Sequence, residues 1–229
     1  MTTQTLQELA DRARALATDG GRAVLGITGA PGAGKTTLVE ALLAELAPTP
    51  PEGAVAEEWV AHVPMDGFHL ADVQLDRLGR RERKGAADTF DVEGYLSSLR
   101  RVIADDGTVV YAPGFERTLE QPVAASIAVL PEARLVLTEG NYLLLPERPW
   151  SKVRTLVDEV WFVDVPESER LARLVARHVR FGKKEDDARA WATGPDQRNA
   201  EMVRAARERA DLVVRLDEVV PPRPTTPTA

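Results

Sequence analysis

Residues 29–36 read Gly-Ala-Pro-Gly-Ala-Gly-Lys-Thr, which is an unbroken G-x-x-x-x-G-K-[ST] phosphate-binding loop. This pattern constrains the fold because such a loop functions only between a buried strand and the first turn of a helix. Residues 23–28 are a short apolar run with β-branched members, as expected of a buried strand. After Lys35, apolar residues recur at helical spacing as far as Leu46. The flanking sequence therefore supports a nucleotide-binding loop.

The residue types in the loop predict how it holds phosphate. Its glycines let the backbone curl so that N–H groups point at phosphate oxygens. Lys35 is expected to reach the β- and γ-phosphates and to be catalytic, and the Thr36 hydroxyl is expected to bind Mg²⁺. The residues predicted to bind ATP are Gly29, Ala30, Pro31, Gly32, Ala33, Gly34, Lys35, Thr36, Thr37, Arg173 and Arg177.

Composition indicates one soluble globular domain. A length of 229 residues with 44% hydrophobic content is enough for a single sizeable core. No apolar run has membrane-spanning length, so no membrane partner is expected. The absence of cysteine excludes disulfides and thiolate metal sites and fits a cytoplasmic enzyme. The net charge of −7 disfavours non-specific binding to nucleic acid.

Strand and helix signals alternate along the chain. Strands are expected at 23–28, 59–63, 108–111, 134–138, 160–165 and 212–216. Helices are expected at 6–16, 36–46, 70–78, 92–104, 153–157, 167–180 and 185–210, the last broken at 193–195. Such alternation predicts an α/β protein, here the three-layer P-loop NTPase fold with a mainly parallel sheet and a helical lid at about 173–195. We expect a single domain over 1–220 and a disordered Pro/Thr tail at 221–229.

Two carboxylates fall after predicted strands, where ligands bind in open α/β sheets. Asp66 could accept the proton of an attacking hydroxyl, or it could be a turn-forming residue before Gly67. Glu139 stands where an acid would hold Mg²⁺, often through water. His69 is expected either to contact substrate or Asp66, or to be structural.

Basic residues crowd one segment of this acidic protein, at Arg77, Arg80, Arg81, Arg83 and Lys84. Such a run is usually a solvated face, but here it precedes residues 88–91, which makes an acceptor-binding loop an alternative. Guanidinium forks would suit an anionic or polyhydroxyl acceptor. Further on, Arg117 could lie over the acceptor or the γ-phosphate, or could belong to a surface turn.

Four arginines recur on one face of the predicted helix at 167–180, at Arg170, Arg173, Arg177 and Arg180. Their position before Gly182 suits a mobile lid that closes on the triphosphate, stabilises charge during transfer and excludes water. The alternative is a solvated stripe. His178 lies on the adjacent apolar face and is expected to be packed rather than catalytic, and the four tryptophans are expected to be packing residues.

A phosphate-binding loop alone leaves several classes of protein open. A GTPase would need an N-K-x-D motif to read the base, and the sequence has none. An ATP-dependent kinase acting on a hydroxyl needs a base such as Asp66. A nucleoside monophosphate kinase needs none, and an ATP-binding regulatory protein would transfer no phosphate.

In this order, the motifs resemble the P-loop kinase group that includes uridine kinase, pantothenate kinase and phosphoribulokinase. The resemblance covers residues 20–216 and rests on the loop at 29–36, Met65-Asp66-Gly67-Phe68, Arg83-Lys84-Gly85, Phe90-Asp91, Glu139-Gly140 and the Arg173/Arg177 pair. Asp66-Gly67-Phe68-His69-Leu70 and the run at 138–144 are most similar to a bacterial branch. That branch is labelled as nucleoside/nucleotide kinases or as a kinase of a fructose transport system.

The resemblance implies ATP and Mg²⁺ at the loop, Asp66 as base, Arg177 in the lid and a small-molecule acceptor, with a homodimer as one expected assembly. The region after Tyr111 lacks the Tyr-Asp and His-Ser/Thr-Arg run of uridine kinases, so the acceptor stays open among a nucleoside, a sugar and a pantothenate-like compound. The catalytic residues expected are Lys35, Asp66 and Arg177. The metal ligands expected are Thr36 and Glu139. The substrate-binding residues expected are Asp66, His69, Arg83, Lys84, Asp91, Tyr111, Arg117 and Glu139.

Overall fold

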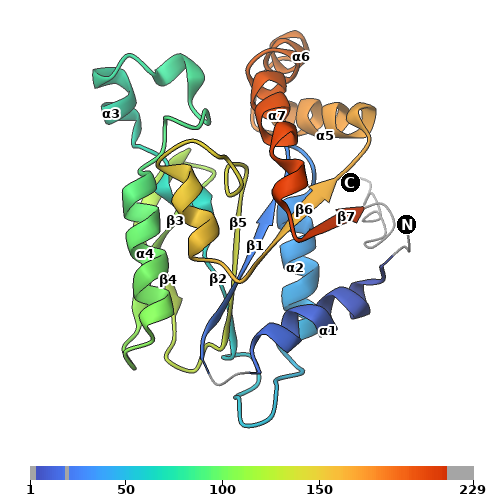
Figure 1. Cartoon of the computed structure of the whole chain (residues 1–229). Coiled ribbons are helices and arrows are strands. Elements are labelled where there is room, and N and C mark those ends of the chain that lie inside the picture. The colour runs from blue at the N-terminus through green and yellow to red at the C-terminus, as the bar shows by residue number, and fades with distance from the viewer. Residues whose placement is uncertain (1–3, 19–20, 216–229) are drawn as a thin grey trace, which may run out of the picture.

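The computed structural model describes residues 4–18 and 21–215 (Figure 1). The predicted tail at 221–229, the end of the predicted domain at 216–220 and the last residue of the predicted final strand lie outside the described residues. No helix of the described residues has the length and apolar character needed to span a membrane.

The central sheet is parallel and has five strands in the order β2-β5-β1-β6-β7. The strands are β2 (Val60–His62), β5 (Leu135–Gly140), β1 (Ala23–Thr28), β6 (Glu159–Asp164) and β7 (Leu212–Arg215). Every residue of β1 and β5 is buried, because both faces of the sheet are covered. The predicted α/β fold with a mainly parallel sheet is confirmed.

Helices cover the two faces of the sheet with separate hydrophobic clusters. On one face, α1 (Leu6–Leu16) and α2 (Lys35–Leu46) pack with Leu25 and Ile27 of β1. On the other, α4 (Val92–Ala104) packs with Val24 of β1 and Val136 of β5. Side chains alternate between faces along a strand, so β1 contributes to both clusters. The result is three layers, with α2 and α4 on opposite sides of the sheet (Figure 1).

A β-hairpin that the sequence did not predict lies beside the main sheet. Strands β3 (Val110–Glu116) and β4 (Gln121–Val129) pair antiparallel as a separate two-stranded sheet. The sequence indicated only a strand at 108–111. The residues of β4 include proline, serine and three alanines and are largely exposed, so they lack the apolar alternation that marks a strand. The hairpin matters because its turn carries Arg117.

Short helices and 3₁₀ turns connect the strands, and three further helices lie near the C-terminal end of the described chain. The predicted helix at 70–78 is shorter, as α3 (Asp72–Arg77), and is flanked by single 3₁₀ turns η1 (Met65–Phe68) and η2 (Arg81–Arg83). Two further 3₁₀ turns are η3 (Trp150–Thr155) and η4 (Arg207–Arg209). The segment predicted as a lid at about 173–195 lies within α5 (Glu167–Arg180), α6 (Glu185–Thr193) and α7 (Pro195–Ala205), and these three helices are called the lid below. The expected break at 193–195 is confirmed, since α7 begins at Pro195 after Gly194.

Candidate functional site

The phosphate-binding loop connects β1 to α2 and has a backbone that requires glycine, as Gly32 and Gly34 show. Gly32 has a φ of +81°, and a Cβ atom there would lie 2.6 Å from Leu174 Cγ of α5. Gly34 has a φ of +95° and is the N-cap of α2. Both conformations are disfavoured for other residues. The loop is thus shaped by its glycines and packed directly against the lid.

The Lys35 ammonium is held inside the loop by oxygen atoms. Its Nζ donates to the carbonyls of Gly29 (3.1 Å) and Ala30 (3.2 Å) and to Asn141 Oδ1 (2.7 Å). Burial lowers the pKa of Lys35 to about 8, while the negative charges of Glu139 and Asp66 oppose the shift. The oxygen atoms that accept from Lys35 belong to neutral groups, so a phosphate bound in the loop would supply a negative charge to pair with the ammonium.

The Thr36 hydroxyl and the Glu139 carboxylate form an oxygen-rich pair. Thr36 Oγ1 lies 3.0 Å from each carboxylate oxygen of Glu139. Burial raises the pKa of Glu139, and the charge of Lys35 works against the rise. His62 Nε2 lies 3.6 Å from Glu139 Oε1 without a hydrogen-bond partner, and burial lowers the pKa of His62 to about 4. The sequence interpretation missed His62.

The oxygen atoms of Thr36 and Glu139 are suitable ligands for a magnesium ion that also binds phosphate. The described residues contain no group of three or more His, Cys, Asp or Glu side chains that could hold a metal ion. Mg²⁺ in phosphate-transfer sites is bound by one or two protein oxygens together with waters and substrate phosphates. Thr36 and Glu139 meet that requirement at the mouth of the loop.

Asp66 lies on η1, the element that follows β2 in the chain, and faces the turn of the hairpin. Its carboxylate oxygen is 3.6 Å from Arg117 Nη2. The neighbouring Gly67 allows this approach, because a Cβ atom there would lie 2.0 Å from the carbonyl oxygen of Pro113 on β3. The close packing of η1 against β3 therefore brings a predicted base and a predicted acceptor contact together.

His69 is fixed beside Asp66 between two aromatic rings. Its Nδ1 lies 2.8 Å from the carbonyl oxygen of Asp66, and its ring centroid is 4.0 Å from that of Phe90 and 4.9 Å from that of Phe115. Burial lowers the pKa of His69, with the charge of Asp66 opposing the shift. A neutral imidazole donating to this carbonyl is the form that the packing favours.

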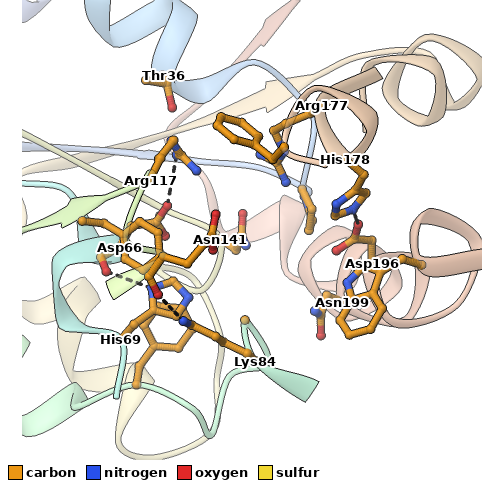
Figure 2. Close-up of a pocket in the computed structure, with 18 of the residues that line it drawn as sticks. Thr36, Asp66, His69, Lys84, Arg117, Asn141, Arg177, His178, Asp196 and Asn199 are labelled. Atoms are coloured by element: carbon orange, nitrogen blue, oxygen red, sulfur yellow. Dashed lines mark hydrogen bonds and ion pairs between the residues drawn. The ribbon is translucent and has the colours of Figure 1, made fainter. Parts of the chain in front are cut away.

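One cavity of about 400 Å³ joins these groups. Figure 2 shows Asp66, His69 and Lys84 on one side of it and His178, Asp196 and Asn199 on the other, with Asn141 between them. The residues that line it are Pro31, Lys35, Thr36, Asp66, His69, Arg81, Lys84, Gly85, Phe90, Phe115, Arg117, Glu120, Glu139, Gly140, Asn141, Arg177, His178, Phe181, Lys183, Trp191, Asp196 and Asn199. Residues that are far apart in the sequence, from Pro31 to Asn199, thus converge at the C-terminal end of the sheet.

Some predicted site residues do not line this cavity. Arg83 forms an ion pair with Asp88 instead. Asp91 is the N-cap of α4, and its carboxylate accepts a hydrogen bond from Gly94 N at 2.9 Å. The Tyr111 side chain is exposed on β3. Arg173 and Thr37 are also outside the lining set, although Arg173 Nη1 donates to the carbonyl of Ala33 in the phosphate-binding loop at 3.4 Å.

The lid contributes cavity residues that were expected to be packing residues. His178 lines the cavity, and its Nε2 lies 2.8 Å from Asp196 Oδ2 of α7. Trp191 of α6 also lines it, with Lys183 Nζ 4.6 Å from the ring centroid. Trp59, Trp150 and Trp161 are buried in the core, as expected. Helical spacing shows which side chains share a face but not whether that face covers a sheet or a cavity. Asp196 and Asn199, three residues apart on α7, were the available signal.

One of the four lid arginines is structural. The Arg170 side chain is fully buried and donates to the carbonyl of Pro31 at 3.3 Å and to Gln197 Oε1. Arg177 is exposed and lines the cavity. Arg170 therefore ties α5 and α7 to the phosphate-binding loop, whereas Arg177 is placed to meet a ligand.

Two known proteins have similar sequences over most of the chain, and one of them carries a kinase name. A Schizosaccharomyces pombe protein named "Putative uridine kinase C227.14" is 36% identical over 179 residues, which span 76% of this chain and 74% of that protein. "Uncharacterized protein YggC" of Escherichia coli is 33% identical over 199 residues, spanning 86% and 79% of the two chains.

A solved structure extends the similarity to the fold. A Silicibacter sp. TM1040 protein described as a "putative fructose transport system kinase" is 36% identical, with a TM-score of 0.80 over 92% of this chain and 98% of that one. Residues 3–56 also match the family model described as "Methylmalonyl Co-A mutase-associated GTPase MeaB". That segment holds β1, the loop and α2, which nucleotide-binding proteins of different activities share.

Proposed function

This chain belongs to the uridine kinase-like P-loop kinases, and we propose that it transfers the γ-phosphate of ATP to a hydroxyl group of a small metabolite. The observation that carries the proposal is that Asp66 lines the same cavity as Lys35, Thr36 and Glu139. A carboxylate facing a triphosphate site has the geometry that transfer to an alcohol needs.

The loop end of the cavity binds the nucleotide in this account. The backbone N–H groups of the loop residues other than Pro31, together with the Lys35 ammonium, hold the β- and γ-phosphates. Thr36 and Glu139 hold Mg²⁺, which offsets the phosphate charge. Arg177 reaches the transferred group from the lid and helps to exclude water.

The acceptor end supplies the base. The acceptor hydroxyl oxygen attacks the γ-phosphorus, its proton passes to Asp66, and the bond between the γ-phosphorus and the bridging oxygen breaks to release ADP. Arg117 Nη2, 3.6 Å from the Asp66 carboxylate, holds that carboxylate at the cavity that both residues line. Asp66 therefore acts only when a hydroxyl lies between it and the γ-phosphate.

ADP release with Mg²⁺ and ATP against a panel of nucleosides, sugars, vitamins and their monophosphates tests the proposal. We expect one class of hydroxyl compound to raise ADP release well above the rate with ATP alone. Stimulation by monophosphates alone would indicate a nucleoside monophosphate kinase. ATP binding without stimulation by any compound would indicate a regulatory ATP-binding protein.

A further inference from the structure

The cations at the Asp66 end of the cavity are already paired with carboxylates. Arg81 Nη1 and Lys84 Nζ share Asp72, at 2.6 Å from Oδ2 and 2.7 Å from Oδ1. Arg117 faces Asp66. The Glu120 residue, which also lines this end, adds a third acid. An anionic acceptor would have to displace one of these carboxylates, so the charge here favours an uncharged ligand.

The lid side of the same cavity offers polar groups that can form further hydrogen bonds. Asp196 is buried, with one carboxylate oxygen bound to His178 and no other side-chain hydrogen bond in the described part of the chain. The Asn199 amide lines the cavity and forms no side-chain hydrogen bond with any residue that the structure describes. A carboxylate and an amide in such positions can accept and donate hydrogen bonds to a ligand.

These groups share one face of one helix. Asp196 and Asn199 are three residues apart on α7, so their side chains lie one above the other. Trp191 of α6 lines the same cavity. Figure 2 shows Asp196 and Asn199 across the cavity from Asp66. A ligand that reaches from Asp66 to α7 would fill the space between the sheet and the lid.

We propose that the acceptor is an uncharged polyhydroxyl compound, whose reacting hydroxyl faces Asp66 and whose other hydroxyls bind Asp196 and Asn199 on the lid. The inference rests on the proposed function and adds an acceptor subsite to it. Buried carboxylates hold sugar hydroxyls in this way, and a cavity of about 400 Å³ is large enough for such a compound. His178 is a positioning residue that orients the Asp196 carboxylate.

The location of the subsite has a consequence for closure. Because Asp196 and Asn199 belong to α7, the acceptor itself would connect the lid to the base. Acceptor binding would then complete the site and exclude water, so that ATP without acceptor is hydrolysed slowly.

Trp191 gives a test that does not depend on turnover. With the loop filled by Mg²⁺ and a non-hydrolysable ATP analogue, we expect neutral members of the panel to change the fluorescence of the protein, and Trp191→Phe to abolish the change. Nucleoside and sugar monophosphates should bind at least about tenfold more weakly than their neutral counterparts. Equal or tighter binding of the monophosphates, or no change with any compound, would overturn the proposal.

Variants of the lid test which residues are involved. Asp196→Asn and Asn199→Ala should each raise the acceptor Kd or KM about tenfold with little change in nucleotide affinity. Asp187→Asn is the matched control, since this exposed carboxylate of α6 is outside the cavity. An acceptor analogue that lacks the hydroxyl bound by Asp196 should bind the unsubstituted protein more weakly than the full acceptor does. The Asp196→Asn variant should bind the analogue and the full acceptor about equally.

The inference and the proposed function fail in different ways. Turnover of a hydroxyl acceptor that Asp196→Asn leaves unchanged would remove the subsite and keep the kinase. Fluorescence-detected binding that depends on Asp196, without turnover of any compound, would keep the subsite and remove the kinase.

Discussion

Thr36 on the first turn of α2 and Glu139 near the end of β5 meet through a hydroxyl that lies 3.0 Å from both oxygens of the carboxylate. The contact joins α2, the helix that follows the phosphate-binding loop, to β5, the strand that pairs with β1 in the sheet. Two oxygen-bearing side chains are thereby fixed where a triphosphate would enter.

Glu139→Gln should weaken the use of magnesium. The amide keeps the size and one oxygen but removes the negative charge, so we expect the Mg²⁺ concentration for half-maximal activity to rise about tenfold to a hundredfold. Metal-free ATP binding should change little. A magnesium titration of ADP release checks this, and an unaltered magnesium requirement would remove Glu139 from the metal site.

Nucleotide binding should take up a proton in mildly alkaline solution. The pKa of Lys35 is lowered to about 8 by burial, so part of the free protein carries a neutral Lys35 above that pH. Phosphate favours the charged ammonium and raises its pKa, so binding at about pH 8.5 should draw in protons, and affinity should fall as the pH rises further. Calorimetry in buffers of different ionisation enthalpy measures this uptake. Proton uptake that persists in Lys35→Met would assign it to another group.

A comparison of Gly32→Ala with Gly53→Ala should separate the effect of loop packing from the effect of backbone strain. Gly32 and Gly53 have nearly the same φ, +81° and +80°, but a Cβ atom meets Leu174 only at Gly32 and has nothing within 4 Å at Gly53. Each change should cost about 1 kcal/mol through its left-handed backbone. Only Gly32→Ala should also lower ATP affinity, by about tenfold or more, because the new methyl group pushes α5 from the loop. Equal ATP affinities in the two variants would contradict this contact.

Asp66→Asn and Asp91→Asn form a matched pair for the base. Both residues were expected from the sequence to act on the acceptor, yet Asp66 lines the cavity and Asp91 caps α4. Asp66→Asn should lower kcat about 10²- to 10⁴-fold while ATP binding stays nearly intact. Asp91→Asn should change little, because asparagine caps helices as well as aspartate does. Comparable losses of kcat in both variants would contradict the assignment of the base.

The parallel sheet was predictable because burial on both faces leaves continuous apolar runs, as in β1 and β5. The hairpin was not. Strand β4 packs little of its surface, and its partner β3 packs against η1 through contacts that no local pattern encodes, such as the approach of Gly67 to Pro113. The hairpin could not be predicted because its residues have a weak intrinsic preference for strands and its position depends on tertiary contacts.

The phosphate end of the site followed from the motif, since spacing alone places Lys35 and Thr36 at a helix N-terminus. The acceptor end depends on how distant segments meet. Arg117 lines the cavity because the hairpin turn reaches Asp66, while Arg83 turns away to Asp88. No feature of the basic run in the sequence distinguishes Arg83, which is outside the cavity, from the next residue, Lys84, which lines it.

The most direct test of the account is the chemical identity of the phosphorylated product. Incubation of the protein with Mg²⁺, ATP and the acceptor that most raises ADP release, followed by ³¹P NMR, shows which bond has formed. The account predicts a phosphomonoester on a hydroxyl oxygen, formed at a rate that Asp66→Asn strongly reduces. A diphosphate formed on an existing phosphate group, at a rate independent of Asp66, would contradict it.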